Sequence, residues 1–290
     1  MTLVPFDQLD GFIWYDGAFV PWKDAKLHVI SHGLHYGGCV FEGERAYNGK
    51  IFKLREHSQR LVDSAHILDM EMPYTTEQIM QYTQETFEKS GFQYAYVRPL
   101  AWRGPEQMGI SALHTKTHVA IACWEWATYF TSEAWEKGIS LKTSKWRKPA
   151  ANTAPTASKA AGLYMLGTLT KHEAERAGFH DALVLDYRGY VAESSGANLF
   201  MVKNGVLNTP IADCFLNGIT RQTVIEMAKG MGIKVEEKVI MPDELLTADE
   251  IFVTGTAAEI TAVSKIDTTT FNVGPISRAL KDAYHDFVRA

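Results

Sequence analysis

The chain has 290 residues, of which 46% are hydrophobic and 22% charged, a composition typical of a folded globular protein rather than a disordered or fibrous one. At about 150 residues per domain, this length predicts roughly two domains. There are 29 Lys and Arg residues against 34 Asp and Glu residues. The net charge of −5 argues against a protein that binds nucleic acid by neutralising phosphates.

Composition also predicts a cytoplasmic protein that does not enter the membrane. No apolar stretch is long enough to span a bilayer, and the N-terminal residues lack the basic and apolar regions of a secretory signal. The cysteines, Cys39, Cys123 and Cys214, are few and widely spaced. They suit a reducing compartment and exclude a disulfide framework or a four-cysteine zinc site.

The first half of the chain mixes hairpins with helices. The dipeptides Asp16-Gly17 and Asn48-Gly49 lie between apolar runs and predict two hairpins. Helices are predicted at 55–70 and 76–90, and strands at 94–102 and 118–126. We therefore expect a smaller N-terminal α+β domain, residues 1–126, followed by an interdomain linker, residues 127–138.

Residues 139–290 form the larger predicted domain, which carries the lysine discussed below. Its predicted elements are a strand at 139–144, a helix at 161–177, hairpins at 187–189 and 204–205, a helix at 221–229, strands at 234–239 and 250–254, and a helix from Pro275 onward. Strands neither alternate strictly with helices nor form one long β series. The fold class is therefore predicted to be α+β rather than a doubly wound sheet.

The segment NTAPTASKAAGLY, residues 152–164, contains one lysine among small residues, directly before a helix-forming run. The positive end of a helix macrodipole would lower the pKa of Lys159, and small neighbours would let a planar partner approach. Such an amine can form a Schiff base with a carbonyl. Taken alone, however, the segment favours a surface lysine in a polar loop.

Other segments offer sites for an anion and for a buried cation. Asn217–Thr220 precedes a helix whose first N–H groups are free, and 254–258 offers small residues after a strand. Arg60 could bind an anion or pair with Glu56. Glu193 interrupts a strand-like run. Its carboxylate is either a charge at the edge of a sheet or the partner of a buried cation such as a pyridinium nitrogen. A lysine, a phosphate cradle and a pyridinium partner are what pyridoxal phosphate requires.

No Walker A, HExxH or GxGxxG motif is present, and we predict no metal site. The histidines His28, His32 and His35 are close in sequence, but no matching carboxylate or thiol set accompanies them.

The sequence resembles the branched-chain amino-acid aminotransferases, which belong to the fold type IV pyridoxal-phosphate enzymes with a two-domain, D-amino-acid aminotransferase-like fold. The resemblance covers nearly the whole chain. It is carried by the ordered motifs SHGLHYG, VFEGERAY, REHSQRL, YVRPL, NTAPTASKAAGLY, ESSGANLF, GITR and GTAAEI.

This resemblance implies a set of cofactor contacts. Lys159 would hold pyridoxal 5′-phosphate covalently and serve as the catalytic base and acid. Glu193 would pair with the pyridinium nitrogen, and Tyr164 would bind the phenolic oxygen. The phosphate end would be held by Arg60, Gly218, Ile219, Thr220 and Thr256.

The resemblance also implies substrate contacts. Tyr96 and the backbone of Thr256 and Ala257 would bind the α-carboxylate. Phe41, Trp126 and Tyr164 would form apolar walls. The second carboxylate of glutamate would meet Tyr36, Arg98 and Tyr129.

By the same resemblance, the enzyme would move the amino group of leucine, isoleucine or valine to 2-oxoglutarate in two half-reactions. Tyr36 and the turn Met108-Gly109-Ile110 would come from a neighbouring subunit, which makes a homodimer the smallest active unit. Two departures from the family pattern concern the pocket: Glu44 stands where many members have an apolar residue, and residues 103–106 add charge beside this turn.

Several alternatives stay open. A D-amino-acid or (R)-amine aminotransferase would share the fold and cofactor, as would a 4-amino-4-deoxychorismate lyase, for which no feature speaks. A Schiff-base aldolase would use Lys159 alone, but the hairpins contradict its eight βα units. A non-catalytic binding protein could dispense with Lys159 or Glu193, and both are present.

Overall fold

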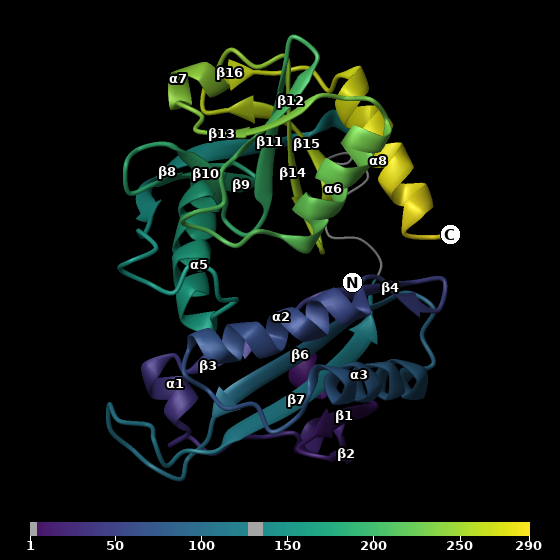
Figure 1. The fold of residues 1–290 in the computed structure, drawn as a ribbon, viewed down its shortest axis with the longest axis vertical. Coiled ribbons are helices and arrows are strands. Elements are labelled where there is room, and N and C mark those ends of the chain that lie inside the picture. Colours follow the sequence, from purple (N-terminus) through teal and green to yellow (C-terminus); the bar gives the residue numbers. More distant parts are fainter. Residues whose placement is uncertain (1–4, 127–135) are drawn as a thin grey trace. The chain divides into compact units, whose positions relative to one another are not determined.

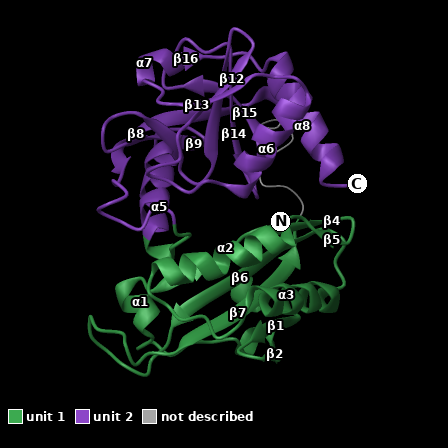
Figure 2. Cartoon of the chain, viewed as in Figure 1, with its two compact units in different colours: residues 1–127, 158–162 green, residues 128–157, 163–290 purple. Residues whose placement is uncertain are grey.

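The computed structural model describes residues 5–126 and 136–290. The chain divides into two compact units, which are residues 1–127 with 158–162, and residues 128–157 with 163–290 (Figure 2).

The segment 158–162 groups with the first unit, whereas the sequence analysis assigned Lys159 to a domain of residues 139–290. The domain boundaries inferred from the sequence remain a prediction. Most of the predicted linker lies outside the described residues.

An antiparallel sheet forms the framework of the first unit (Figure 1). Its strands lie in the order β2-β1-β7-β6-β4-β5, and β3 also pairs with β6. The turns Asp16-Gly17 and Asn48-Gly49 have positive φ at every residue, as two-residue hairpins require, so both predicted hairpins are confirmed. The strands are β1 (Phe12–Tyr15), β2 (Ala18–Pro21), β3 (Cys39–Phe41), β4 (Glu44–Tyr47), β5 (Lys50–Ile51), β6 (Ala95–Arg103) and β7 (Thr117–Glu125).

Helices α2 (Leu54–Ile67) and α3 (Thr76–Ser90) pack on this sheet through one apolar core that includes Leu61, Ile79 and Val97. Both helices were predicted. Thr75 and Gln78 form a reciprocal capping box at the start of α3, and Gly91 ends the helix in the left-handed conformation. Three shorter helical segments are η1 (Phe6–Gln8), η2 (Trp22–Asp24) and α1 (His32–Tyr36).

The second unit contains a mixed sheet in the order β10-β9-β8-β15-β14-β11-β12-β13, with β16 paired to β15. Because β10 also pairs with β11, six of these strands close into a ring. The strands are β8 (Ile139–Lys148), β9 (Asp181–Asp186), β10 (Val191–Ser194), β11 (Asn198–Lys203), β12 (Val206–Pro210), β13 (Val235–Lys238), β14 (Glu250–Gly255), β15 (Glu259–Ile266) and β16 (Thr269–Thr270).

The helices of this unit are α5 (Ala161–Arg176), α6 (Ile219–Gly230), α7 (Pro242–Leu245) and α8 (Pro275–Phe287). Leu141, Leu199 and Val253 are fully buried in its main core. Phe200 and Phe252, on neighbouring strands, stack with their ring centroids 5.0 Å apart.

The predicted α+β class is confirmed, whereas β3, β15, β16, η1, η2, α1 and α7 were not predicted. β3, α1 and α7 are too short to show a periodicity. β15 mixes apolar side chains with Thr, Ser and Lys without a clear alternation, and it begins directly after the predicted anion-binding segment 254–258. Strand β8 also continues beyond the predicted 139–144 to Lys148.

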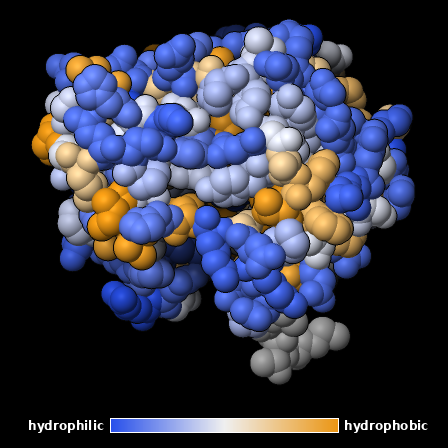
Figure 3. Space-filling model, turned by 90° about the horizontal axis from the view of Figure 1, so that it is seen from below, coloured by the Kyte–Doolittle hydropathy of each residue, from blue (hydrophilic) through white to orange (hydrophobic). Residues whose placement is uncertain are grey.

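Among the described residues, no helix combines the length and apolarity needed to cross a bilayer. Figure 3 shows one face of the molecule, on which small apolar groups are interspersed among polar side chains.

Candidate active site

Lys159 has a backbone fixed from two sides within the first unit. Its N–H donates to Ser64 Oγ on α2 at 3.0 Å, and its carbonyl accepts from the N–H of Phe41 on β3 at 3.2 Å. The neighbouring Ser158 hydroxyl donates to the carbonyl of Ser64 at 2.9 Å. A helix and a strand therefore determine where the Lys159 side chain begins.

Aromatic and cationic groups surround this amine. Lys159 Nζ lies 4.9 Å from the centroid of the Phe41 ring, and the guanidinium carbon of Arg98 lies 4.7 Å from the same centroid. Burial lowers the pKa of Lys159 to about 8, and the positive charge of Arg60 adds to this shift. At neutral pH a useful fraction of the amine is consequently uncharged and nucleophilic. The main causes of the lower pKa are therefore burial and a neighbouring arginine, and not the predicted helix dipole.

Tyr96 and Arg98 project from β6 into the same cluster. Arg98 Nη2 donates to the Tyr96 hydroxyl at 3.0 Å, and the Tyr96 ring lies 5.0 Å from both Trp124 and Trp126. A Cβ atom on Gly43 would come within 2.1 Å of the Tyr96 hydroxyl, so only glycine fits there. Arg98 Nε is buried without a hydrogen-bond partner in the described part of the chain, which leaves a donor for an anionic ligand.

Arg60 is held by a buried carboxylate. Its Nε and Nη2 donate to the two oxygens of Glu42 at 2.6 and 2.8 Å, and His57 Nδ1 lies 2.6 Å from the same carboxylate. Burial alone would raise the pKa of Glu42, but Arg60 and His57 hold it well below its ordinary value. Two guanidinium nitrogens of Arg60, which is predicted to bind the phosphate, are thus already paired with Glu42.

Glu193 lies on β10 in the second unit and is almost fully buried. Its Oε1 is 2.5 Å from Lys148 Nζ at the end of β8, and its Oε2 accepts from Asn198 Nδ2 at 3.0 Å. Burial would lower the pKa of Lys148, but the Glu193 carboxylate raises it. Glu193 therefore sits in a polar network and not at a strand edge.

The N-terminus of α6 is linked to this network through Asn198. Gly218 is the N-cap residue and has no side chain with which to cap the helix, so the first-turn N–H groups, including those of Ile219 and Thr220, could bind an anion. Gly218 N–H donates to Asn198 Oδ1 at 3.2 Å.

The structure brings only some of the predicted site residues together. In the first unit, Phe41, Tyr96, Arg98, Trp126 and Lys159 form one cluster. Tyr36 ends α1 with its ring 4.7 Å from His32, whereas Ile110 is 84% exposed between β6 and β7.

The remaining predicted residues belong to the second unit or are not described. Tyr164 lies half-buried in the first turn of α5, and Thr256 and Ala257 form the turn between β14 and β15. Tyr129 lies outside the described residues.

Sequence reasoning missed Glu42, Lys148 and Asn198, which hold three of the predicted residues by hydrogen bonds or ion pairs. One signal was available for Asn198. It lies five positions after Glu193, across a short turn, which places the two side by side in a hairpin.

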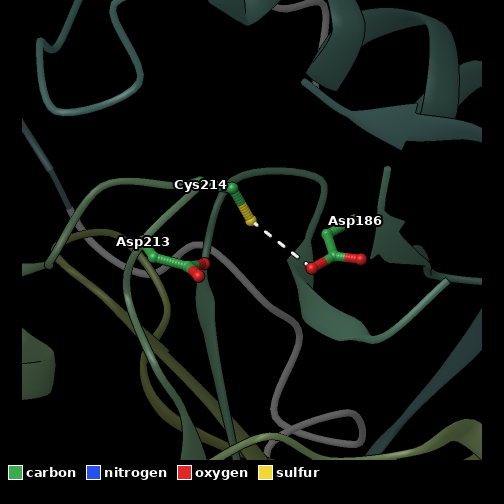
Figure 4. A group of neighbouring side chains, drawn as sticks. All are labelled: Asp186, Asp213 and Cys214. Atoms are coloured by element: carbon green, nitrogen blue, oxygen red, sulfur yellow. Dashed lines mark hydrogen bonds between the residues drawn. The ribbon is translucent and has the colours of Figure 1, made fainter. Parts of the chain in front are cut away.

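A separate group, Asp186, Asp213 and Cys214, brings possible metal ligands close together (Figure 4). Arg188 donates to Asp186 at 2.8 Å and to Asp213 at 2.9 Å, so the two carboxylates share its one positive charge. Burial raises the pKa of the Cys214 thiol to about 12, and the thiol is protonated at neutral pH. The contacts within this group are those of an ion-pair network.

Comparisons with known proteins agree over almost the whole chain. The family model of the class IV amino-transferases matches residues 39–266. The branched-chain-amino-acid aminotransferase of Pseudomonas aeruginosa is 43% identical over 286 residues, which cover 96% of this chain and 93% of that protein.

Solved structures are equally similar. A crystal structure of a T.th. branched-chain amino acid aminotransferase with pyridoxamine 5′-phosphate matches with a TM-score of 0.94 and 43% identity, covering 97% of this chain and 96% of that chain. The same protein complexed with N-(5′-phosphopyridoxyl)-L-glutamate matches with a TM-score of 0.92 and 42% identity, covering 97% and 95%.

Proposed function

Because the chain belongs to the class IV aminotransferases, we propose that it moves the amino group of branched-chain L-amino acids to 2-oxoglutarate, with pyridoxal 5′-phosphate as cofactor. The family resemblance and the fold type IV architecture predicted from the motifs are confirmed. The observation that carries the proposal is the full-length match, at 43% identity, to proteins named for this activity.

The chain's residues fit the cofactor. Its phosphate would lie at the N-terminus of α6, near Ile219 and Thr220, with Thr256 and Arg60 as further ligands. Arg60 would exchange contacts with Glu42 for contacts with phosphate. The buried Thr254 hydroxyl, on the strand that leads to Thr256, has no hydrogen-bond partner among the described residues, which supports a ligand at this edge.

Glu193 would pair with the pyridine nitrogen of the cofactor and Tyr164 with its phenolic oxygen. When bound, the cofactor supplies the carbonyl and the electron sink of amino-acid chemistry. Lys159 supplies the amine that holds it and then takes the proton from the substrate Cα. A lysine whose pKa is about 8 can release and accept this proton near neutral pH.

One pocket must accept both a branched apolar side chain and the second carboxylate of glutamate. Phe41 and Trp126 offer apolar walls, and Arg98 offers a cation whose Nε is unpaired in the described chain. Arg98 lies over the Phe41 ring, so a cation and an apolar surface are side by side. The same place could therefore accept either the carboxylate or the branched side chain. Tyr96 would bind the α-carboxylate together with the backbone of Thr256 and Ala257.

The experiment that tests this function is a coupled assay with 2-oxoglutarate and three amino donors: L-leucine, D-alanine and (R)-1-phenylethylamine. We expect turnover with L-leucine and little with the other two. The Lys159→Ala variant should show none. Faster turnover with D-alanine or the amine would favour the alternative aminotransferases of the same fold.

The active unit is proposed to be a homodimer in which Tyr36 and the Met108–Ile110 turn complete the partner's site. Their exposure supports this: Tyr36 is 45%, Met108 42% and Ile110 84% exposed. Mixing two inactive variants, Lys159→Ala and Tyr36→Ala, should restore part of the activity, because one site of each mixed dimer then has both residues. Sedimentation as a monomer under assay conditions would contradict the dimer.

A cytoplasmic location is part of the proposal. Cys39, Cys123 and Cys214 are all free thiols, which supports a reducing compartment. Fractionation of the native host should find the activity in the cytoplasm.

A further inference from the structure

Asn198 touches two parts of the second unit that the proposed function assigns to opposite ends of the cofactor. Its Nδ2 donates to Glu193 Oε2 at 3.0 Å, and its Oδ1 accepts from Gly218 N–H at 3.2 Å. The same Nδ2 also donates to the carbonyl of Leu216 at 3.1 Å. One amide thus contacts both the proposed pyridinium partner and the N-cap of α6.

The Asn198 amide is fixed in this position. It is 5% exposed, and its residue pairs with Glu193 on β10 and with Thr254 on β14. The three strands hold its backbone, and the donors and acceptors around it determine which way its amide faces. A buried amide with every group satisfied is costly to rotate.

Gly218 closes the contact from the other side. A Cβ atom at this residue would lie 2.3 Å from Asn198 Oδ1. The backbone of Gly218, at φ −61° and ψ 140°, is one that any residue can adopt. Glycine is therefore required here by the approach of the Asn198 amide and not by backbone conformation.

We propose that Asn198 is a positioning residue that fixes the Glu193 carboxylate and the N-terminus of α6 relative to each other. The ring and the phosphate of the cofactor would then be bound at the same time. The inference rests on the proposed function, since that function supplies the two-ended ligand. It predicts that a change at the phosphate end affects binding at the ring end, and that this effect passes through Asn198.

Two probes separate the ends: pyridoxal, which has the ring without the phosphate, and inorganic phosphate, which has no ring. Pyridoxal affinity is measured by the visible absorption band of the full-length chain freed of cofactor, and phosphate affinity by thermal stabilisation. Asn198→Ala should weaken both by about tenfold, because a hydrogen bond to a charged group and one to the helix N-cap are lost.

The matched control is Asn208→Ala. Asn208 is also a buried asparagine of the same sheet, but its amide donates to the nearby carbonyl of Val206. A general loss of packing would affect this variant as much as Asn198→Ala. We expect both of its affinities to stay within about twofold of the original.

Gly218→Ala provides a second variant that does not remove a core side chain. Its Cβ would displace the Asn198 amide, so pyridoxal binding should weaken although Gly218 lies at the phosphate end. In the double variant with Asn198→Ala the collision is absent. The further loss of pyridoxal affinity caused by Gly218→Ala should then fall to about twofold or less.

The inference is overturned if Asn198→Ala weakens only one probe, if Asn208→Ala weakens both equally, or if the effects of Asn198→Ala and Gly218→Ala simply add. Failure of the proposed function is distinguishable in the unmodified chain: a wrong cofactor would give no visible band with pyridoxal phosphate, and a wrong substrate class would give a band that does not bleach with L-leucine.

Discussion

Lys148 and Glu193 form a buried ion pair, with Nζ and Oε1 2.5 Å apart and side chains 14% and 10% exposed. Lys148 ends β8, and Glu193 lies on β10. A carboxylate with no nearby cation would be costly at this position. Lys148 therefore compensates Glu193 while no ligand is bound, and a pyridinium nitrogen would bring a second positive charge to the same carboxylate.

Replacing Lys148 with Met should destabilise the cofactor-free chain by about 3 kcal/mol, because Glu193 is left buried and uncompensated. Bound cofactor would restore a positive partner, so it should stabilise Lys148→Met more than it stabilises the original chain. Urea unfolding with and without pyridoxal phosphate measures both effects.

The control for this variant is Lys142→Met. Lys142 pairs with Asp267 at 2.6 Å in the same unit, but both side chains are more than a third exposed. This change should cost less than about 1 kcal/mol, with or without cofactor. Equal stabilisation of Lys148→Met and the original chain by cofactor would show that the pyridine ring does not meet Glu193.

Capture of pyridoxal by Lys159 should depend on pH in a way that reports its environment. Only the uncharged amine attacks a carbonyl, and its pKa is about 8 instead of the ordinary 10.5. The rate of capture should rise with pH and level off above pH 8. Stopped-flow absorbance, followed by reduction and peptide mapping, measures it for this lysine alone.

Arg60→Met tests the cause of this shift. Removing the neighbouring cation makes the charged amine less unfavourable, so the pKa of Lys159 should rise and the plateau should move to higher pH. Pyridoxal lacks the phosphate that Arg60 would bind, and the comparison is therefore free of that contact. A plateau that stays near pH 8 would show that the shift does not depend on Arg60.

Glu44 is expected to make the chain less stable as pH rises. It is fully buried, and neither carboxylate oxygen has a hydrogen-bond partner among the described residues. Burial and the nearby Glu42 raise its pKa well above the ordinary value, while Arg60 opposes this. Folded Glu44 therefore keeps its proton to a higher pH than unfolded Glu44 does, so stability falls as pH increases above about 4.5.

Glu44→Met should stabilise the chain, by about 1–3 kcal/mol at pH 8 and by less at pH 5. Glu44→Gln, which keeps the polar group but cannot ionise, should remove the same pH dependence with a smaller gain. Denaturant unfolding at the two pH values gives these differences. A gain from Glu44→Met that is identical at pH 5 and pH 8 would contradict a raised pKa of Glu44.

Arg98→Met should separate the two substrates of the proposed reaction. The guanidinium would bind the second carboxylate of 2-oxoglutarate, whereas 4-methyl-2-oxopentanoate has no such group. We expect KM for 2-oxoglutarate to rise about tenfold or more, and KM for the branched oxo acid to change much less. A similar rise for both would assign Arg98 to the shared α-carboxylate.

Local features of the fold were predictable from the sequence. The Asp16-Gly17 and Asn48-Gly49 hairpins and the cap of α3 at Thr75 depend on residues adjacent in the chain. The attachment of Lys159 to Ser64 was not predictable, because 95 residues separate them. No local pattern encodes such a contact.

The same limit applies to the site. The motif resemblance predicted the residues that would contact ligands, but not the residues that position those side chains. Lys148 reads in sequence as the basic end of a strand, and only the pairing of β8 with β9 and of β9 with β10 brings it to Glu193. Glu42 meets Arg60 across 18 residues.

The most direct test of the proposed reaction is the visible absorption spectrum of the purified chain supplied with pyridoxal phosphate. We predict a yellow band that bleaches on addition of L-leucine and returns with 2-oxoglutarate. The Lys159→Ala variant should not bind the cofactor covalently. A band that ignores L-leucine but bleaches with D-alanine would contradict the proposed substrate. The absence of any band would contradict the cofactor itself.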